Sequence, residues 1–146
     1  MEETLPERLI LVVQENPEHR DVLEQVFAES AMPHRTITLP NGKQALDFLY
    51  RRGDYSEAPR PDLILLELNL PEKDGREILA EIKKNPQLRR IPIIILTVSD
   101  SKEDIFRAYA LQGNCYVIKS SDLEQLALTA RRIEEFWLGI VTLPLE

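Results

Sequence analysis

Five short runs rich in apolar residues recur along the chain, and we interpret them as strands. They lie at residues 9–13, 35–39, 63–68, 91–96 and 115–118. Most are apolar almost throughout, as expected for strands covered on both faces in a parallel sheet. The second run alternates polar and apolar residues, which predicts a place near an edge. The run at 63–68 is expected to be the central strand.

Each run is followed by a segment whose apolar residues recur at helical spacing. Asn16 and Asn41 are expected to cap the first two helices, and Asn85-Pro86 to end the third. Capping boxes are expected to open the last two helices, at Asp100 with Glu103 and at Ser121 with Glu124. On the fourth helix, Ile105, Ala108 and Tyr109 are expected to point inward.

Regular alternation of strands and helices predicts an α/β fold, a doubly wound five-stranded parallel sheet with right-handed crossovers. The length of 146 residues suits one domain, which we place at residues 1–139. Residues 140–146 form a mostly apolar tail beyond the last helix.

Composition narrows the classes of function. The net charge of −7 argues against a nucleic-acid-binding surface, and no apolar stretch approaches the length of a membrane span. The start lacks the pattern of a signal peptide, so we expect a cytoplasmic protein. No two glycines lie close enough for a glycine-rich phosphate loop. His19 and His34 are expected at the surface, and Cys115 is expected to be a small core residue.

Polar side chains gather where the strands end, and parallel strands all end at one edge of the sheet. They are Gln14, Glu15, Glu67, Thr97 and Lys119. Carboxylates suit magnesium, a hydroxyl can bond a phosphoryl oxygen, and lysine supplies a positive charge. Any one of these residues could be an ordinary solvent-exposed polar residue at the end of a strand. Their occurrence at four strand ends together favours a binding site for a divalent cation and a phosphoryl group. Acid–base hydrolysis by Glu15 and Glu67, as in a metal-dependent hydrolase, is disfavoured because no pocket-forming insertions accompany them.

Several motifs occur in the order of one known family. They are Gln14-Glu15, Leu-Leu-Glu-Leu-Asn-Leu-Pro-Glu-Lys-Asp-Gly at 65–75, Leu-Thr-Val-Ser at 96–99 and Tyr-Val-Ile-Lys at 116–119. With these motifs the chain resembles the receiver domain of two-component response regulators, which has a flavodoxin-like fold. More narrowly, Arg-Pro-Asp-Leu-Ile-Leu-Leu and Glu-Glu-Phe-Trp-Leu-Gly-Ile-Val-Thr-Leu-Pro resemble stand-alone receivers that partner cyanobacterial phytochrome histidine kinases.

The resemblance implies transfer of a phosphoryl group from a kinase histidine to an aspartate, with magnesium. Glu67 stands at the acceptor position. Gln14 and Glu15 stand at metal-holding positions, and Asn69 stands where a backbone carbonyl joins them. Thr97 matches the residue that bonds the phosphoryl group and Lys119 the family's lysine. Tyr116 matches the aromatic residue that changes rotamer on activation.

Two departures from the family pattern bear on activity. Glu67 replaces an aspartate, and its extra methylene moves the carboxylate by roughly 1.5 Å, which is costly for a transfer that depends on positioning. Gln14 replaces an acid. Three acids with one lysine would give the pocket −3 + 1 = −2, whereas Glu15, Glu67 and Lys119 give −2 + 1 = −1. Magnesium is therefore expected to bind weakly or not at all.

These departures favour a phosphorylation-independent signalling or interaction module that is not an enzyme. Glu67 either reaches Lys119 and partly mimics a phosphorylated aspartate, or points to solvent in an inactive site, and the sequence leaves both open. The alternative is a working phosphorelay regulator of a phytochrome-type histidine kinase. Output is expected through another protein, around Tyr109 and Tyr116, with no nucleic acid or membrane involved.

The apolar tail has two interpretations. It could fold back on its own domain, or it could cross to a second copy, as the resemblance to phytochrome-linked receivers implies. For the second case, the residues expected in a homodimer interface are Phe136, Trp137, Ile140, Val141 and Leu143.

Overall fold

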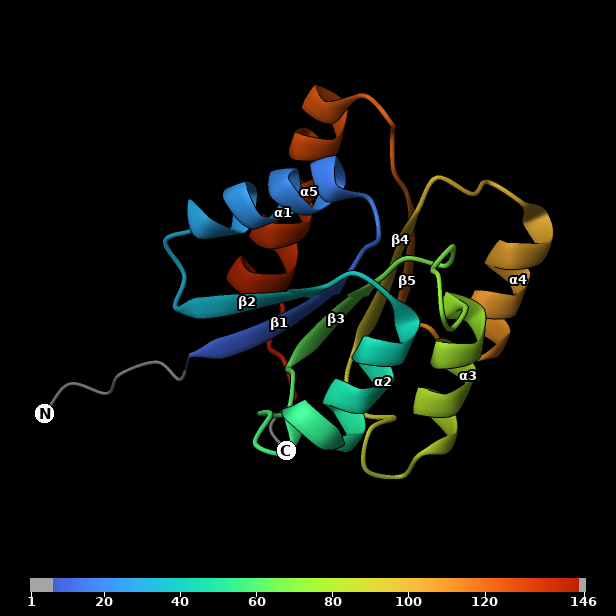
Figure 1. The fold of residues 1–146 in the computed structure, drawn as a ribbon. Coiled ribbons are helices and arrows are strands. Elements are labelled where there is room, and N and C mark those ends of the chain that lie inside the picture. Colours follow the sequence, from blue (N-terminus) through green and yellow to red (C-terminus); the bar gives the residue numbers. More distant parts are fainter. Residues whose placement is uncertain (1–6, 145–146) are drawn as a thin grey trace, which may run out of the picture.

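The computed structural model describes residues 7–144 and confirms the predicted fold class (Figure 1). Five parallel strands form one sheet in the order β2-β1-β3-β4-β5. Their bounds are β1 Arg8–Val13, β2 His34–Leu39, β3 Leu63–Leu66, β4 Ile93–Thr97 and β5 Cys115–Ile118. As predicted, the third strand is central and the second lies at an edge.

Helices cover both faces of the sheet. Their bounds are α1 Pro17–Ala28, α2 Gly42–Tyr50, α3 Gly75–Lys84, α4 Lys102–Ala110 and α5 Leu123–Gly139, with a short 3-10 helix η1 at Gly53–Tyr55. In Figure 1, α1 and α5 lie on one face and α2, α3 and α4 on the other. Within the described residues, no helix is long and apolar enough to cross a bilayer.

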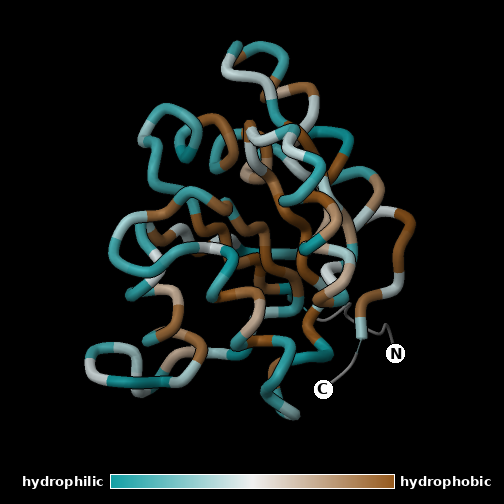
Figure 2. The backbone as a smooth tube through the Cα atoms, turned by 90° about the vertical axis from the view of Figure 1, so that its right-hand side faces the viewer, coloured by the Kyte–Doolittle hydropathy of each residue, from teal (hydrophilic) through white to brown (hydrophobic). Residues whose placement is uncertain are grey.

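The strands are the most apolar part of the chain and separate two layers of core. One layer packs β1, β3 and β4 side chains against α2 and α3, with Ala108 of α4. The other packs alternate residues of the same strands against α1 and α5. Figure 2 shows hydrophobic colour concentrated along the inner strands, with hydrophilic colour in the outer turns. Burial on both faces explains why these strands read as continuous apolar runs.

Local capping chemistry sets where the helices begin. Asn16 and Asn41 cap α1 and α2 as predicted. The predicted capping boxes of the last two helices are wrong by one residue. Ser101 caps α4 by accepting from the Asp104 N–H, and Asp122 caps α5 by accepting from the Glu124 and Gln125 N–H groups. In each case a neighbouring side chain with equal capping ability takes the role.

The α4 prediction also fails in part, because Tyr109 points outward. Ala108 is the buried residue of this helix, Ile105 is half-buried, and Tyr109 is 52% exposed. The Tyr109 hydroxyl accepts a hydrogen bond from the Tyr116 N–H at 3.2 Å. Tyr109 therefore ties the outer side of α4 to β5 instead of filling the core.

The loop between β3 and α3 is held on two sides by glycines. A Cβ on Gly75 would clash with the Glu67 carbonyl, and a Cβ on Gly42 would clash with the Lys73 carbonyl. Gly75 also donates its N–H to the Leu68 carbonyl at 2.9 Å. Close backbone approach at both points fixes the loop that follows Glu67.

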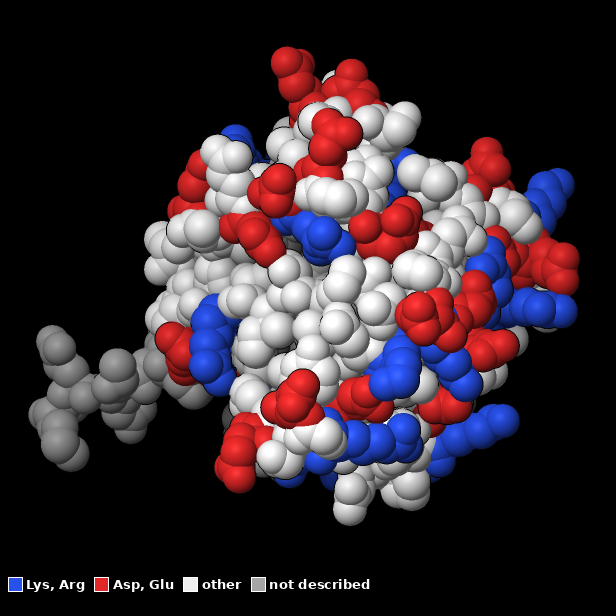
Figure 3. Space-filling model, viewed as in Figure 1, with Lys and Arg blue, Asp and Glu red and all other residues white. Residues whose placement is uncertain are grey.

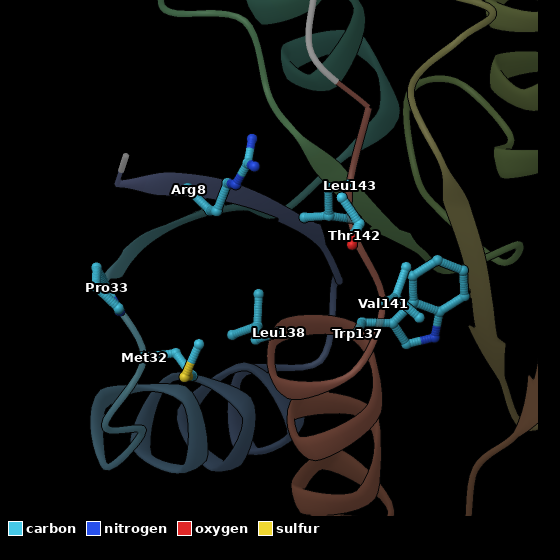
Figure 4. Close-up of a pocket in the computed structure, with 8 residues that line it drawn as sticks. All are labelled: Arg8, Met32, Pro33, Trp137, Leu138, Val141, Thr142 and Leu143. Carbon is cyan, nitrogen blue, oxygen red and sulfur yellow. The ribbon is translucent and has the colours of Figure 1, made fainter. Parts of the chain in front are cut away.

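The described part of the tail runs back along the sheet. Leu143 is buried in the core layer of α1 and α5, and Val141 packs against that layer. A cavity of about 180 Å³ lies beside the tail, and Figure 4 shows Met32 and Leu138 on one side of it and Leu143 above. Leu143 thus acts as a core residue of its own domain.

Candidate functional site

Buried polarity is confined to one end of the sheet. Within residues 7–144, the buried polar or charged side chains are Gln14, His19, Glu67, Thr97 and Lys119. Four of them are the predicted strand-end residues, and the fifth, His19, contacts Lys119. Because β1 and β3 are neighbours, the site lies where the order of the strands reverses, as is usual for open α/β sheets.

Glu67 is 5% exposed, and its carboxylate is closed over the site. Its Oε1 lies 3.0 Å from the Lys119 Nζ. Its Oε2 accepts from two backbone N–H groups, those of Leu68 at 2.7 Å and Asn69 at 3.2 Å. Both carboxylate oxygens are therefore occupied by protein donors.

Lys119 is 4% exposed and joins Glu67 to His19. Its backbone N–H donates to the Thr97 carbonyl at 2.8 Å, which continues the pairing of β5 with β4. Its Nζ lies 2.8 Å from His19 Nδ1. Burial lowers the pKa of Lys119, and the charge of Glu67 opposes that shift.

The expected surface position of His19 is wrong. His19 is 6% exposed and lies in the first turn of α1. The signal was present in the sequence, since His19 precedes Leu23 by four residues and Val26 by seven, on the buried stripe of the helix. His34 is half-buried and its Nδ1 lies 2.8 Å from the Met32 carbonyl. Cys115 is half-buried in β5, and burial raises the pKa of its thiol.

The predicted metal positions fit a divalent cation poorly. Gln14 is buried and its Oε1 accepts from the Asn16 N–H at 3.3 Å, while Glu15 is exposed. The Arg20 guanidinium donates to the Gln14 carbonyl at 3.1 Å and adds positive charge nearby. Among the described residues, no three His, Cys, Asp or Glu side chains converge on one point.

Asn69, the third predicted metal position, is exposed and connects the site to α3. Its side-chain oxygen lies 3.4 Å from the Arg76 guanidinium. With Glu67 bound to Lys119 and two amides, only Glu15 remains as an uncommitted acid at the predicted positions. Magnesium prefers carboxylates and near-ideal octahedral geometry, so this donor set offers it little.

Thr97 and Tyr116 lie on the side of the site that faces α4. Thr97 is fully buried, and its hydroxyl accepts from the Ser99 N–H at 3.4 Å. The Tyr116 hydroxyl donates to the Ser99 carbonyl at 3.0 Å. Both predicted residues are therefore connected to the loop between β4 and α4.

An arginine clamp that the sequence did not reveal holds this loop. Arg76 donates two parallel hydrogen bonds to Asp104, at 2.7 and 2.8 Å, and a third to Asp74 at 3.0 Å. Ser99 Oγ donates to the same Asp104 carboxylate at 2.7 Å. Hydrogen bonding to Arg76 lowers the pKa of Asp104 to about 2. The clamp joins the first turns of α3 and α4 beside Thr97 and Tyr116.

Comparison of the sequence with models of known protein families identifies the family of this chain. The model of the response regulator receiver domain matches residues 10–131. The chain belongs to this family. Response regulator Rcp1 of Synechocystis is 46% identical over 143 residues, covering 98% of this chain and 97% of Rcp1.

A second relative and two solved structures are also similar to this chain. A probable methanogenesis regulatory protein, FilR2 of Methanothrix harundinacea, is 39% identical over 131 residues. The aligned part covers 90% of this chain and 84% of FilR2. The crystal structure of the Mn²⁺-bound form of Rcp1 matches with a TM-score of 0.92, 94% of this chain and 99% of that one. The phosphorylated cyanobacterial phytochrome response regulator RcpA also matches with a TM-score of 0.92, at 46% identity, covering 96% and 100%.

The residues predicted for a dimer interface separate into two groups in this receiver. Phe136 and Ile140 are 49% and 73% exposed at the end of α5. Trp137 and Val141 are half-buried, and Leu143 is buried. Phe136 and Trp137 rings meet edge to face at 5.7 Å. Figure 4 shows the Trp137 ring on the opposite side of the tail from Met32.

Proposed function

We propose that this receiver is a signalling or interaction module whose state is set by Glu67 without phosphorylation. The observation that carries the proposal is the closed carboxylate, with Oε1 on Lys119 and Oε2 on two backbone amides. The Lys119 ammonium and these two amides are donors that a bound anion could accept hydrogen bonds from at this position. Glu67 supplies one negative charge and two oxygens, against nearly two charges and three oxygens for a phosphoryl group, so the mimicry is partial.

The same contacts oppose phosphoryl transfer to Glu67. An attacking oxygen has to lie in line with the leaving group, and catalysis depends on that position. Each Glu67 oxygen is held by a hydrogen bond in a buried site, so attack requires breaking Lys119 or amide contacts first. Weak magnesium binding would also remove the charge neutralisation that the metal contributes to phosphoryl transfer.

We propose a histidine kinase, or another signalling protein, as the partner. Rcp1 and RcpA, two similar receivers, are response regulators, and RcpA is described as phytochrome-linked. A phytochrome-type histidine kinase is therefore the first partner to test. Acidic and basic side chains are interspersed over the face in Figure 3, which suits protein contact better than binding of a nucleic acid polyanion. Exposed Phe136 and Ile140 are the proposed centre of a homodimer contact.

Intact-mass analysis after incubation with acetyl phosphate and magnesium tests this function. The native chain is expected to gain no phosphoryl group. The Gln14→Asp/Glu67→Asp double variant restores the family's acids and is expected to gain one. A phosphoryl group on the native chain would overturn the proposal.

A working phosphorelay receiver is the second candidate. Thr97 and Lys119 favour it, because both lie at the site and match the residues that handle the phosphoryl group in the family. The same mass measurement separates the candidates, and peptide mapping would locate any phosphoryl group that was gained.

A further inference from the structure

His19 is a buried histidine with no role in the function proposed above. Its Nδ1 lies 2.8 Å from the Lys119 Nζ, and the same Nζ lies 3.0 Å from Glu67 Oε1. All three side chains are buried, and they come from α1, from the residue after β3 and from the residue after β5. They form a chain of contacts across the end of the sheet.

The hydrogen-bonding chemistry of Lys119 fixes which ring nitrogen of His19 carries the proton. A lysine ammonium has three donors and no lone pair, so it can only donate. His19 Nδ1 must then be the acceptor, and the imidazole proton must lie on Nε2. Two of the three ammonium hydrogens are thereby directed, one to Glu67 and one to His19.

We propose that His19 is a positioning residue that holds the Lys119 ammonium against Glu67. This inference rests on the proposed function, since it concerns what keeps the Glu67–Lys119 pair closed. A buried ammonium needs acceptors in place of water, and a carboxylate oxygen alone supplies one. An aliphatic side chain at position 19 would fill the space but leave one directed hydrogen without a partner.

The charges around the imidazole agree with a neutral, accepting His19. Burial and the positive charge of Lys119 lower the pKa of His19. Glu67, Glu18 and Glu15 act in the opposite direction, and they are weaker than burial. A protonated imidazole would lose its acceptor and place a second cation beside the ammonium.

The second histidine of the chain provides an internal control. His34 Nδ1 lies 2.8 Å from the Met32 carbonyl, which can only accept, so His34 must carry its proton on Nδ1. Long-range ¹H–¹⁵N correlation spectra of the native chain at neutral pH are expected to show opposite tautomers, Nε2–H for His19 and Nδ1–H for His34. An Nδ1–H or a charged imidazole at His19 would overturn the proposal.

Two variants test the hold on Lys119 itself. His19→Gln keeps an acceptor, the side-chain amide oxygen. His19→Leu removes the acceptor and replaces the imidazole by an apolar side chain of similar volume. The readout is hydrogen exchange of the Lys119 ammonium, followed in ¹H–¹⁵N spectra of folded protein. We expect exchange to rise about tenfold in His19→Leu, the effect of one lost hydrogen bond, and to stay near native in His19→Gln. Equal exchange rates in the native chain and in His19→Leu would refute the proposal that His19 positions the Lys119 ammonium.

The tautomer measurement needs no variant, so it decides the proposal even if His19→Leu does not fold. Failure here is also separable from failure of the proposed function. Phosphorylation of the native chain would overturn the function while leaving the tautomers unchanged, and an Nδ1–H tautomer at His19 would overturn the hold alone.

Discussion

Glu67 uses the length of its side chain to bend back over its own loop. One oxygen reaches the Leu68 and Asn69 amides, one and two residues ahead, and the other reaches Lys119 across the sheet. The charge removed from water is thus matched by three hydrogen bonds. A buried ion pair of this kind need not add much stability, but removing one partner is costly.

Lys119→Met is therefore expected to destabilise the chain by about 3–5 kcal/mol at neutral pH, because it leaves a buried carboxylate without its cation. Urea unfolding followed by circular dichroism would measure the change. The double variant Lys119→Met/Glu67→Gln removes both charges and is expected to recover most of the loss. A single variant as stable as the native chain would contradict the buried pair.

The extent to which sequence predicted the site differs from residue to residue. Strand ends could be located because apolar runs stop abruptly, so Gln14, Glu67, Thr97 and Lys119 were expected at one edge and are found there. His19 was missed because a histidine is usually assigned to the surface, although its spacing on α1 placed it inward. Orientation of Glu67 was not predictable, since either closure or solvation satisfies a carboxylate.

Among the elements, order and position were predictable, whereas the starts of α4 and α5 and the contacts between helices were not. Alternation of strands and helices implies one sheet with two covered faces, and capping by Asn16 and Asn41 follows from local chemistry. The start of α4 depends on competition between adjacent Asp100 and Ser101, whose capping energies are similar. Arg76 and Asp104 lie on different helices, and pairing between them depends on tertiary geometry.

The clamp between α3 and α4 makes stability depend on pH. The pKa of Asp104 is lowered to about 2, so its contribution is present above its unfolded pKa and is lost as pH falls from about 4 through about 2. We expect Asp104→Asn to cost about 1–2 kcal/mol near neutral pH and progressively less toward pH 2. Urea unfolding of both proteins across this range measures the difference. A difference independent of pH would exclude an ionised clamp.

For the whole molecule, the tail belongs to the fold as well as to the proposed dimer contact. Leu143 is buried beyond α5, while Phe136 and Ile140 are exposed. The side chains available to a second copy are thus reduced to those that folding leaves exposed. Stability and association should therefore respond to different positions.

Leu143→Ala is expected to destabilise the chain by roughly 2 kcal/mol through lost burial, as measured by urea unfolding. Ile140→Asp is its matched control, with little effect on unfolding because the side chain is 73% exposed. In light scattering, Ile140→Asp is expected to lower the mass from dimer to monomer. A dimer that persists in Ile140→Asp would exclude this residue from the contact.

The glycines beside the β3–α3 loop have a consequence for redesign of the pocket. A Cβ at Gly42 or Gly75 would meet backbone atoms of this loop and its neighbours, so close backbone contact holds the loop after Glu67. We therefore expect the loop to keep its position when side chains at positions 14 and 67 are exchanged. The pocket can then be varied one side chain at a time, with the same backbone as a fixed reference.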